Sequence, residues 1–388
     1  MKNKKKKICI VTGSRADYDL LKNLINHLQK KKKFKLSLIV TGQHISKNYG
    51  NTKIKVFKDF RKICKTININ IKKTNSTSIL NSISLGINKI GKYLKSEKPN
   101  LIILLGDRYE ILSAGIGSIY NDVKIAHIHG GEVTAGSIDD IIRHTITKFS
   151  DLHFVSTEAY KKRVIQMGEN PKNVFNVGSL GVENIKTTKL IDKEKLEKEL
   201  SIKFDKYNFL ITINSFIEQN ISINHFLKNF FLAIKKFKDT SFIFTMPNSD
   251  LKSDTIRNKI LDFCRKNKNS FAFKSLGAQK YLSCMKICDI VLGNSSSGIL
   301  EAPTLKTATV NIGDRQKGRE QANSIINSDY SFKKIHDSIK KSLSLDFKKK
   351  IEKTKNPYFK KSTVLNIAKI VEKKIFEKKI EVKKFYDI

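Results

Sequence analysis

The sequence predicts an α/β fold with two domains, each built on a parallel β-sheet that helices cover on both faces. The chain has 388 residues. A chain of that length is longer than those that usually fold around one hydrophobic core, so we expect two domains of roughly 180 to 200 residues each. In addition, short apolar, β-branched runs alternate with helical stretches along the chain, which is typical of covered parallel sheets.

The predicted strands fall into two series. The first covers residues 7–13, 35–42, 100–107, 124–131, 152–157 and 174–179. The second follows a Lys- and Glu-rich stretch and covers residues 208–214, 241–248, 271–276, 288–294 and 308–313. A charged amphipathic helix is predicted over residues 365–379. We therefore expect Rossmann-like domains over residues 1–184 and 185–360, and a C-terminal helix and tail over 361–388 that packs back toward the first domain.

Polar clusters follow nearly every predicted strand. Ligands of open parallel sheets bind beyond the carboxyl ends of the strands, where loops and helix N-termini converge. Two such domains facing each other would form a cleft, with one end of the substrate on each side. The sequence thus predicts a binding cleft lined by the loops that follow the strands.

Composition limits the partners. The formal charge is +39, from 75 Lys and Arg against 36 Asp and Glu. The lysines lie in short runs without interleaved aromatic residues, which indicates a solvated Lys-rich surface and not a nucleic-acid site. A basic field would help to gather a polyanionic small substrate. The five cysteines form no paired motif and no run reaches membrane-spanning length, so we expect a cytoplasmic protein without a membrane partner.

A phosphate site is predicted at residues 293–301, where Gly-Asn-Ser-Ser-Ser-Gly leads from a strand into a helix. Backbone N–H groups, hydroxyls and the helix dipole would meet there, and Glu301 could accept hydrogen bonds from a ribose diol. The alternative is an ordinary serine N-cap. Arg315 and Arg319 follow the next strand and suit the geometry of a diphosphate. No phosphate loop or dinucleotide fingerprint occurs, so ATP hydrolysis and nicotinamide chemistry lose their usual support.

In the first half, Arg15 lies in the turn after the first strand, where it either holds phosphate or is an exposed residue of a helix-capping turn. Asp107 ends the most apolar strand. An aspartate in that place serves chemistry or holds a neighbouring loop.

Residues 127–144 concentrate titratable groups. A capping-box pattern at 137–140 opens a helix with apolar positions Ile138, Ile142, Ile146 and Phe149. Asp139 aligns with Arg143, and Asp140 with His144, at a spacing of four residues. His129, Glu132 and the two aspartates could share one pocket wall and divide into an acid and a base, although an acid at a helix start also stabilises the helix. His127, His129 and Glu132 lack a further ligand at standard spacing, so no metal is predicted.

Together these motifs resemble the hydrolysing UDP-N-acetylglucosamine 2-epimerases of sialic acid synthesis. The resemblance runs in order from residue 7 to beyond residue 320 and rests on GSRADYD, TGQHISKNYGNT, GDRYE, HIHGGEVTAGSIDDIIRHTITK, GNSSSGILE and NIGDRQKGRE. It implies a GT-B type fold, a homo-oligomer (dimer or tetramer), and hydrolysis of UDP-GlcNAc to N-acetylmannosamine and UDP without a cofactor. UDP would leave by elimination, and water would then add with inversion at C2.

The resemblance also implies roles for individual residues. The acid–base set would be Asp107, Glu132 and Asp139 or Asp140, supported by His44, His129 and Arg143. A second set would hold UDP: Arg15, Asn248, Ser295, Ser296, Glu301 and Arg319.

One position departs from the family. After the first strand of the second domain, members usually carry His-Pro, with the histidine facing the substrate, whereas this chain has Asn214 and Ser215. Asparagine forms hydrogen bonds but does not transfer protons near neutral pH. Asn214 either suffices for binding, slows the enzyme, or marks a different substrate. The first alternative is a UDP- or GDP-linked 2,4-diacetamido-2,4,6-trideoxyhexose of the legionaminic acid route. A glycosyltransferase of the same fold and a non-catalytic basic binding protein are the others.

Overall fold

The structure, a computed structural model, describes residues 5–46, 51–70, 75–134, 138–215, 221–247, 253–377 and 383–388. The chain forms two compact units. The first unit comprises Met1–Glu132, Ser137–Asn184 and Lys360–Ile388, and the second comprises Val133–Gly136 and Ile185–Phe359. Among the described residues, no helix is both long and apolar enough to span a membrane.

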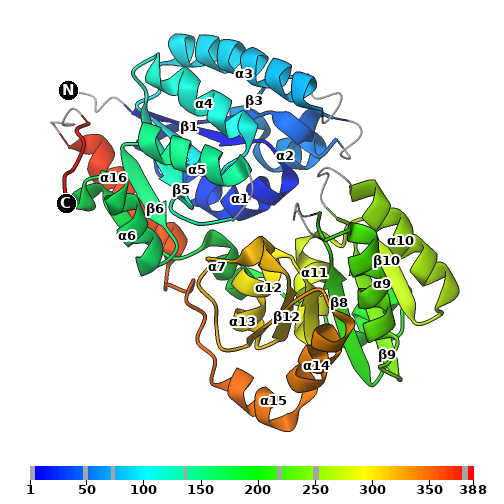
Figure 1. Ribbon diagram of the computed structural model, residues 1–388. Helices are drawn as coiled ribbons and strands as arrows, with labels where there is room; N and C mark the ends of the chain where they lie inside the picture. The colour runs from blue at the N-terminus through cyan, green and yellow to red at the C-terminus, as the bar shows by residue number, and fades with distance from the viewer. Residues whose placement is uncertain are drawn as a thin grey trace. The chain divides into compact units, whose positions relative to one another are not determined.

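A seven-stranded parallel sheet forms the first unit, in the order β3-β2-β1-β4-β5-β6-β7 (Figure 1). Its strands are β1 (Lys6–Thr12), β2 (Phe34–Val40), β3 (Cys64–Thr66), β4 (Leu101–Leu105), β5 (Lys124–Ile128), β6 (Leu152–Val155) and β7 (Val174–Asn176). Strand order reverses between β1 and β4, and ligands of such sheets bind beyond the carboxyl ends at that point. The loops after these two strands carry the GSRADYD and GDRYE motifs.

Two apolar cores cover the two faces of this sheet. One joins Ile8 and Ile10 to α1 (Arg15–Gln29) and α16 (Thr363–Phe376). The other joins Cys9 and Val11 to α3 (Ser76–Glu97), α4 (Tyr109–Ile119) and α5 (Ile138–Phe149). The remaining helices of the unit are α2 (Lys53–Phe60), α6 (Glu158–Gln166) and the start of α7 (Leu180–Thr187).

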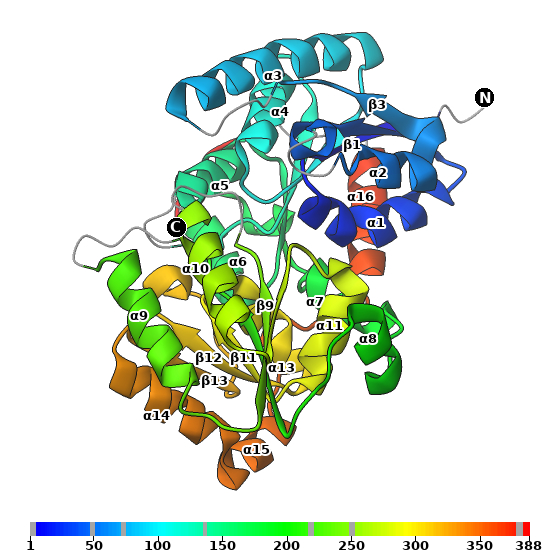
Figure 2. The same ribbon diagram turned by 90° about the vertical axis from the view of Figure 1, so that its right-hand side faces the viewer.

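The C-terminal segment belongs to the first unit. Helix α16, red in Figures 1 and 2, packs beside α1. Glu372 of this helix pairs with Lys31 at 2.7 Å. Farther on, the Lys383 ammonium lies 2.7 Å from a Glu169 carboxylate oxygen, and the Tyr386 N–H donates to the Gly168 carbonyl at 2.9 Å.

The second unit is a six-stranded parallel sheet in the order β10-β9-β8-β11-β12-β13 (Figure 2). Its strands are β8 (Tyr207–Thr212), β9 (Thr240–Thr245), β10 (Ser270–Phe273), β11 (Ile290–Gly293), β12 (Ala308–Ile312) and β13 (Ile325–Ser328). Its helices are α8 (Lys193–Leu200), α9 (Ile223–Ile234), α10 (Ser253–Lys266), α11 (Gly277–Ile287), α12 (Ser296–Leu300), α13 (Ala302–Leu305), α14 (Phe332–Leu343) and α15 (Leu345–Glu352). One core packs α9, α10, α14 and α15 on the sheet, and the other packs α8, α11 and α13.

Some expectations need correction. Strands β3 and β13 were not predicted, because each lies at a sheet edge and has only three or four residues. The apolar stripe expected for α5 is only partly buried: Ile146 is inaccessible, whereas Ile138 is 70% exposed. Helix α16 ends at Phe376. The expected capping residue Ser137 lies outside the described residues, as does the sugar-nucleotide contact predicted for Asn248.

Candidate functional site

In the first unit, the predicted acids gather around Arg143 of α5. One Arg143 nitrogen, Nη1, donates to the Glu132 carbonyl at 2.8 Å and to the Asp140 carboxylate at 2.9 Å. The other, Nη2, pairs with the Asp107 carboxylate. Burial disfavours the charged guanidinium, but the Asp107 and Glu132 carboxylates outweigh that effect and raise the pKa of Arg143. A buried, permanently charged group therefore joins three segments that sequence reasoning had placed in one site.

Glu132 differs from the two aspartates in its surroundings. Its side chain is buried, and Ser156 Oγ donates to Oε1 at 3.1 Å. His129 Nδ1 lies 3.6 Å from the same oxygen. His129 has φ +67°, a conformation that is strained for a residue other than glycine, and its N–H donates to the Phe154 carbonyl at 2.9 Å. The loop after β5 is thus held in a fixed, unusual conformation beside Glu132.

Asp140 contacts two basic residues of α5, Arg143 and His144. Besides Arg143 on one carboxylate oxygen, it has His144 Nε2 at 3.5 Å from the other. Burial lowers the pKa of His144, although Asp140 acts in the opposite direction. Asp139 is exposed at the first turn of the helix. Of the two aspartates left open by the sequence, Asp140 has the observed ion pair with Arg143.

His44 lies in a short 3-10 helix after β2 and is fully buried. Its Nε2 is 3.0 Å from Thr12 Oγ1, and its Nδ1 is 2.8 Å from Thr52 Oγ1. Burial lowers the pKa of His44 to about 4. The ring is therefore neutral near pH 7 and serves as a hydrogen-bonding group at the ends of β1 and β2.

The turn that carries Arg15 is a helix cap. The N–H groups of Gly13 and Ser14 donate to Asp17 Oδ2 at 3.0 and 2.9 Å, and Ser14 caps α1 in return. Arg15 is exposed on the first turn of the helix. The turn is thus a capping box, and the contact of Arg15 with phosphate stays a prediction.

Sequence reasoning missed Arg108 and Glu110. Glu110 is fully buried and accepts a hydrogen bond from Arg108 Nε at 2.7 Å. A Cβ atom on Gly13 would lie 2.3 Å from Glu110 Oε1, and one on Gly42 would lie 2.8 Å from it. Both glycines therefore make room for this carboxylate. The available signal was a glycine within two residues of the end of β1 and of β2.

In the second unit, Asn214 and Asn294 bond each other across neighbouring strands. The Asn214 N–H donates to Asn294 Oδ1 at 2.7 Å, and Asn294 Nδ2 donates to the Asn214 carbonyl at 2.8 Å. Gln316 Nε2 donates to the Asn294 carbonyl at 2.9 Å. Both asparagines are buried. The loops after β8, β11 and β12 are thereby tied together, and the side chain of Asn294 fixes the main chain of Asn214 within the second unit.

Gly293 allows this close approach of β8 and β11. It has φ +133°, and a Cβ atom there would lie 2.0 Å from the Thr212 carbonyl oxygen. Only glycine is compatible with both conditions. Residues 294–297, Asn-Ser-Ser-Ser, are called the serine loop here. The glycine that precedes this loop is thus required by the backbone of the site.

The serine loop is more compact than the sequence suggested. Ser295 caps α12 by accepting from the Ser297 N–H at 3.3 Å, and Tyr281 Oη lies 2.5 Å from Ser297 Oγ. Burial raises the pKa of Tyr281 to about 12. The helix predicted after the serines is divided into five-residue α12 and α13, which contains Pro303 in its first turn, and Glu301 lies at the junction. The dipole expected to favour phosphate therefore comes from a short helix.

Other predicted contacts lie near this loop or beyond the described residues. Arg315 Nη1 donates to the Asn294 carbonyl at 3.4 Å. Arg319 Nη2 donates to Thr134 Oγ1 at 3.3 Å. Ser296 is partly exposed at the start of α12. Their contacts with a nucleotide stay predictions.

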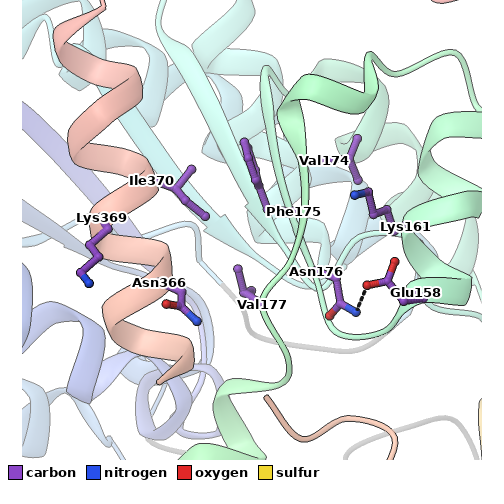
Figure 3. Close-up of a pocket in the computed structure, with 9 residues that line it drawn as sticks. All are labelled: Glu158, Lys161, Val174, Phe175, Asn176, Val177, Asn366, Lys369 and Ile370. Carbon is purple, nitrogen blue, oxygen red and sulfur yellow. Dashed lines mark hydrogen bonds between the residues drawn. The ribbon is translucent and has the colours of Figure 1, made fainter. Parts of the chain in front are cut away.

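A cavity of about 420 Å³ lies elsewhere in the first unit, between α6, β7 and α16 (Figure 3). Phe175 and Ile370 contribute apolar surface, and Lys161 and Lys369 contribute charge. Asn176 donates to Glu158 at 2.7 Å at its rim. No residue of the predicted acid–base set lines this cavity. Within the described ranges, no group of three or more His, Cys, Asp or Glu is arranged to hold a metal ion.

The family model for UDP-N-acetylglucosamine 2-epimerase matches residues 26–372. The chain belongs to the UDP-N-acetylglucosamine 2-epimerase family. The resemblance inferred from the motifs is therefore confirmed. The chain is 40% identical over 384 residues to polysialic acid biosynthesis protein P7 of Escherichia coli, a match that covers 99% of this chain and 98% of that protein.

A second relative differs in its named substrate. The chain is 42% identical over 337 residues to the hydrolysing GDP/UDP-N,N'-diacetylbacillosamine 2-epimerase of Campylobacter jejuni, a match that covers 85% of this chain and 88% of that protein. Among solved structures, the UDP-GlcNAc 2-epimerase of Methanocaldococcus jannaschii in complex with UDP-GlcNAc and UDP matches with a TM-score of 0.78. That match has 20% identity and covers 95% of this chain and 99% of the other. The predicted GT-B type fold is confirmed.

Proposed function

We propose that this protein hydrolyses UDP-GlcNAc to N-acetylmannosamine and UDP, with inversion at C2, as a step toward sialic acid. The observation that carries the proposal is the gathering of Asp107, Glu132 and Asp140 around Arg143 at the carboxyl ends of one parallel sheet. Such a set supplies the proton transfers that the reaction needs. The relative named for polysialic acid biosynthesis supports the choice of sugar.

The reaction has two stages. In the first, a base removes the C2 proton, the C1–O bond to the diphosphate breaks, and the electron pair forms a C1–C2 double bond while UDP leaves. In the second, water adds its hydroxyl to C1 and a proton reaches C2 from the opposite face. The reaction therefore needs a base, an acid and a group that directs water.

The carboxylates of the first unit have the contrast that such a division requires. Asp107 and Asp140 are paired with a guanidinium, whereas Glu132 is buried beside a serine hydroxyl. Carboxyl groups in different environments are the usual means of providing an acid and a base in one site. We assign proton transfer to these three groups and a supporting role to His129.

UDP binding is assigned to the second unit. Ser295, Ser296, Glu301 and Arg319 follow its strands, and these positions belong to the family motifs on which the proposal rests. Asn214 is buried with its main chain held by Asn294. We propose that its amide binds substrate and that no proton passes through it.

A second candidate substrate is a UDP- or GDP-linked 2,4-diacetamido-2,4,6-trideoxyhexose. The match at 42% identity to a hydrolysing diacetylbacillosamine 2-epimerase favours it. The chemistry at C1 and C2 would be the same, so the same carboxylates would serve. The difference would lie in the contacts to C4 and C6.

An NMR time course of the purified protein in D₂O distinguishes these substrates. UDP-GlcNAc and the UDP- and GDP-linked diacetamido sugars are supplied separately. We expect free N-acetylmannosamine with deuterium at C2, together with UDP. Turnover of only a diacetamido sugar would assign the second substrate, and no turnover of any of the three would overturn the proposed function.

A further inference from the structure

Asp107, Glu132 and Asp140 around Arg143 are called the acid cluster here. His127 is a fully buried histidine that is not part of this cluster. It lies on β5, between β4 and β6 in the sheet. Its Nε2 is 2.8 Å from the Gly106 carbonyl oxygen, and its Nδ1 is 3.2 Å from Thr147 Oγ1. The ring thus connects the end of β4 to helix α5.

The partners determine the direction of these hydrogen bonds. A carbonyl oxygen only accepts, so Nε2 carries the proton and donates to Gly106. Burial lowers the pKa of His127 to about 3, so the ring is neutral and Nδ1 is an acceptor. Thr147 Oγ1 lies 3.2 Å from Nδ1 and 3.0 Å from the Arg143 carbonyl oxygen, so its one proton is shared between these two acceptors. The contacts form one connected chain from Thr147 through His127 to Gly106.

Each end of this chain adjoins a residue of the proposed site. Gly106 directly precedes Asp107 and has φ +77°. Thr147 lies four residues after Arg143, one turn farther along α5. His127 therefore adds a buried connection between the two segments that the Asp107–Arg143 ion pair joins.

The segment that carries Glu132 meets the same ring. A Cβ atom on Gly130 would lie 3.0 Å from Thr147 Oγ1 and 3.1 Å from His127 Nδ1. Gly130 thus packs directly against the hydrogen bond between these side chains. Three acid-bearing segments converge on one imidazole.

We propose that His127 is a positioning residue that fixes the backbone under Asp107, Glu132 and Arg143. This inference rests on the proposed function for its effect on turnover. Its effect on backbone order is independent of the substrate.

The first test compares His127→Phe, which keeps the ring volume without the hydrogen bonds, with His127→Gln, which keeps a donor for Gly106. We expect kcat to fall about 100-fold in His127→Phe, because small misplacement of catalytic groups has effects of that size. KM should stay within about threefold of wild type. His127→Gln should recover kcat to within about tenfold of wild type, since one hydrogen bond is restored.

The matched control is His153→Phe. His153 pairs with His127 in register on β6 and is equally buried, but its Nε2 lies 3.0 Å from Glu169, a residue outside the acid cluster. We expect the kcat of this variant to stay within about threefold of wild type. A loss of kcat equal to that of His127→Phe would overturn the proposal, as would a His127→Phe enzyme with wild-type kcat.

Thr147→Val is a second, milder variant, because valine keeps the shape of threonine and removes only the hydroxyl. Amide hydrogen exchange is measured by mass spectrometry for peptides covering residues 105–110 and 138–149. We expect faster exchange there in Thr147→Val and His127→Phe but not in His153→Phe. Unchanged exchange would overturn the proposal, whereas exchange as expected without turnover by the wild type would overturn only the proposed function.

Discussion

The Arg143 guanidinium pairs with the Asp107 carboxylate and thereby joins α5 to the loop after β4. The same guanidinium reaches the Glu132 carbonyl and Asp140. One side chain that is almost inaccessible to solvent thus sets the relative positions of three acidic residues. The geometry of the proposed acid–base set depends on this residue.

Arg143→Lys tests that dependence. A lysine has one nitrogen on a flexible chain and does not reproduce the planar contacts of arginine to several acceptors. We expect kcat to fall by about 100-fold or more. Arg257→Lys is the control, because Arg257 forms an exposed pair with Asp254 on α10. Steady-state kinetics check both, and an Arg143→Lys enzyme with wild-type kcat would refute the role.

Asn214→Ala tests whether the residue that replaces the family histidine only binds substrate. Asn294 holds the main chain of Asn214, so removal of the side chain leaves that contact intact. We expect kcat/KM to fall about tenfold, the effect of one lost hydrogen bond. Kinetics with the identified substrate measure this ratio. A loss beyond about 1000-fold would indicate that Asn214 takes a larger part in the chemistry.

Gly13→Ala tests the space that Glu110 occupies. The added methyl group would lie 2.3 Å from the Glu110 carboxylate, so we expect a loss of about 1 to 3 kcal/mol in the free energy of unfolding. Gly91→Ala in α3 is the control, because its nearest neighbour is 3.7 Å away. That change should stabilise the protein by about 0.5 to 1 kcal/mol. Urea unfolding measures both, and equal stability of the two variants would contradict the packing argument.

The burial of His44 predicts that the free energy of unfolding decreases at acidic pH. Burial lowers its pKa to about 4, so between pH 6.5 and 4 the unfolded chain binds a proton that the folded protein does not. The free energy of unfolding should therefore decrease as the pH falls through this window, by about 3 kcal/mol from this residue. His44→Gln should reduce this pH dependence and exposed His225→Gln should not. Urea unfolding at pH 7 and 4.5 decides, and a His44→Gln protein with the wild-type dependence would exclude His44 as the source.

The central strands of both sheets were predictable because a parallel strand that is covered on both faces is apolar throughout. Residues 101–105, Leu-Ile-Ile-Leu-Leu, are the clearest case, and all of them are buried. Strand β3, Cys-Lys-Thr, gives no such signal because it lies at the sheet edge. The pairing of Glu372 with Lys31 and Lys33 was also beyond prediction, because it depends on where the chain returns to α1.

The candidate site was predictable where it follows strands and where the family motifs name its residues. The contribution of Glu110 was not, since its burial depends on the meeting of three loops that contain Gly13, Gly42 and Arg108. Spacing on a helix also left Asp139 and Asp140 as alternatives, because residues three and four positions from Arg143 lie on the same face. The ion pair between Asp140 and Arg143 is seen only in the structure.

The most direct test of the account is the rate at which UDP-GlcNAc in D₂O yields N-acetylmannosamine with deuterium at C2, measured for wild type and Glu132→Gln beside the affinity for UDP. The account predicts incorporation by the wild type and almost none by Glu132→Gln, with UDP affinity within about threefold of wild type because the nucleotide is assigned to the second unit. Incorporation by Glu132→Gln at the wild-type rate would contradict the assignment of proton transfer to the carboxylates around Arg143.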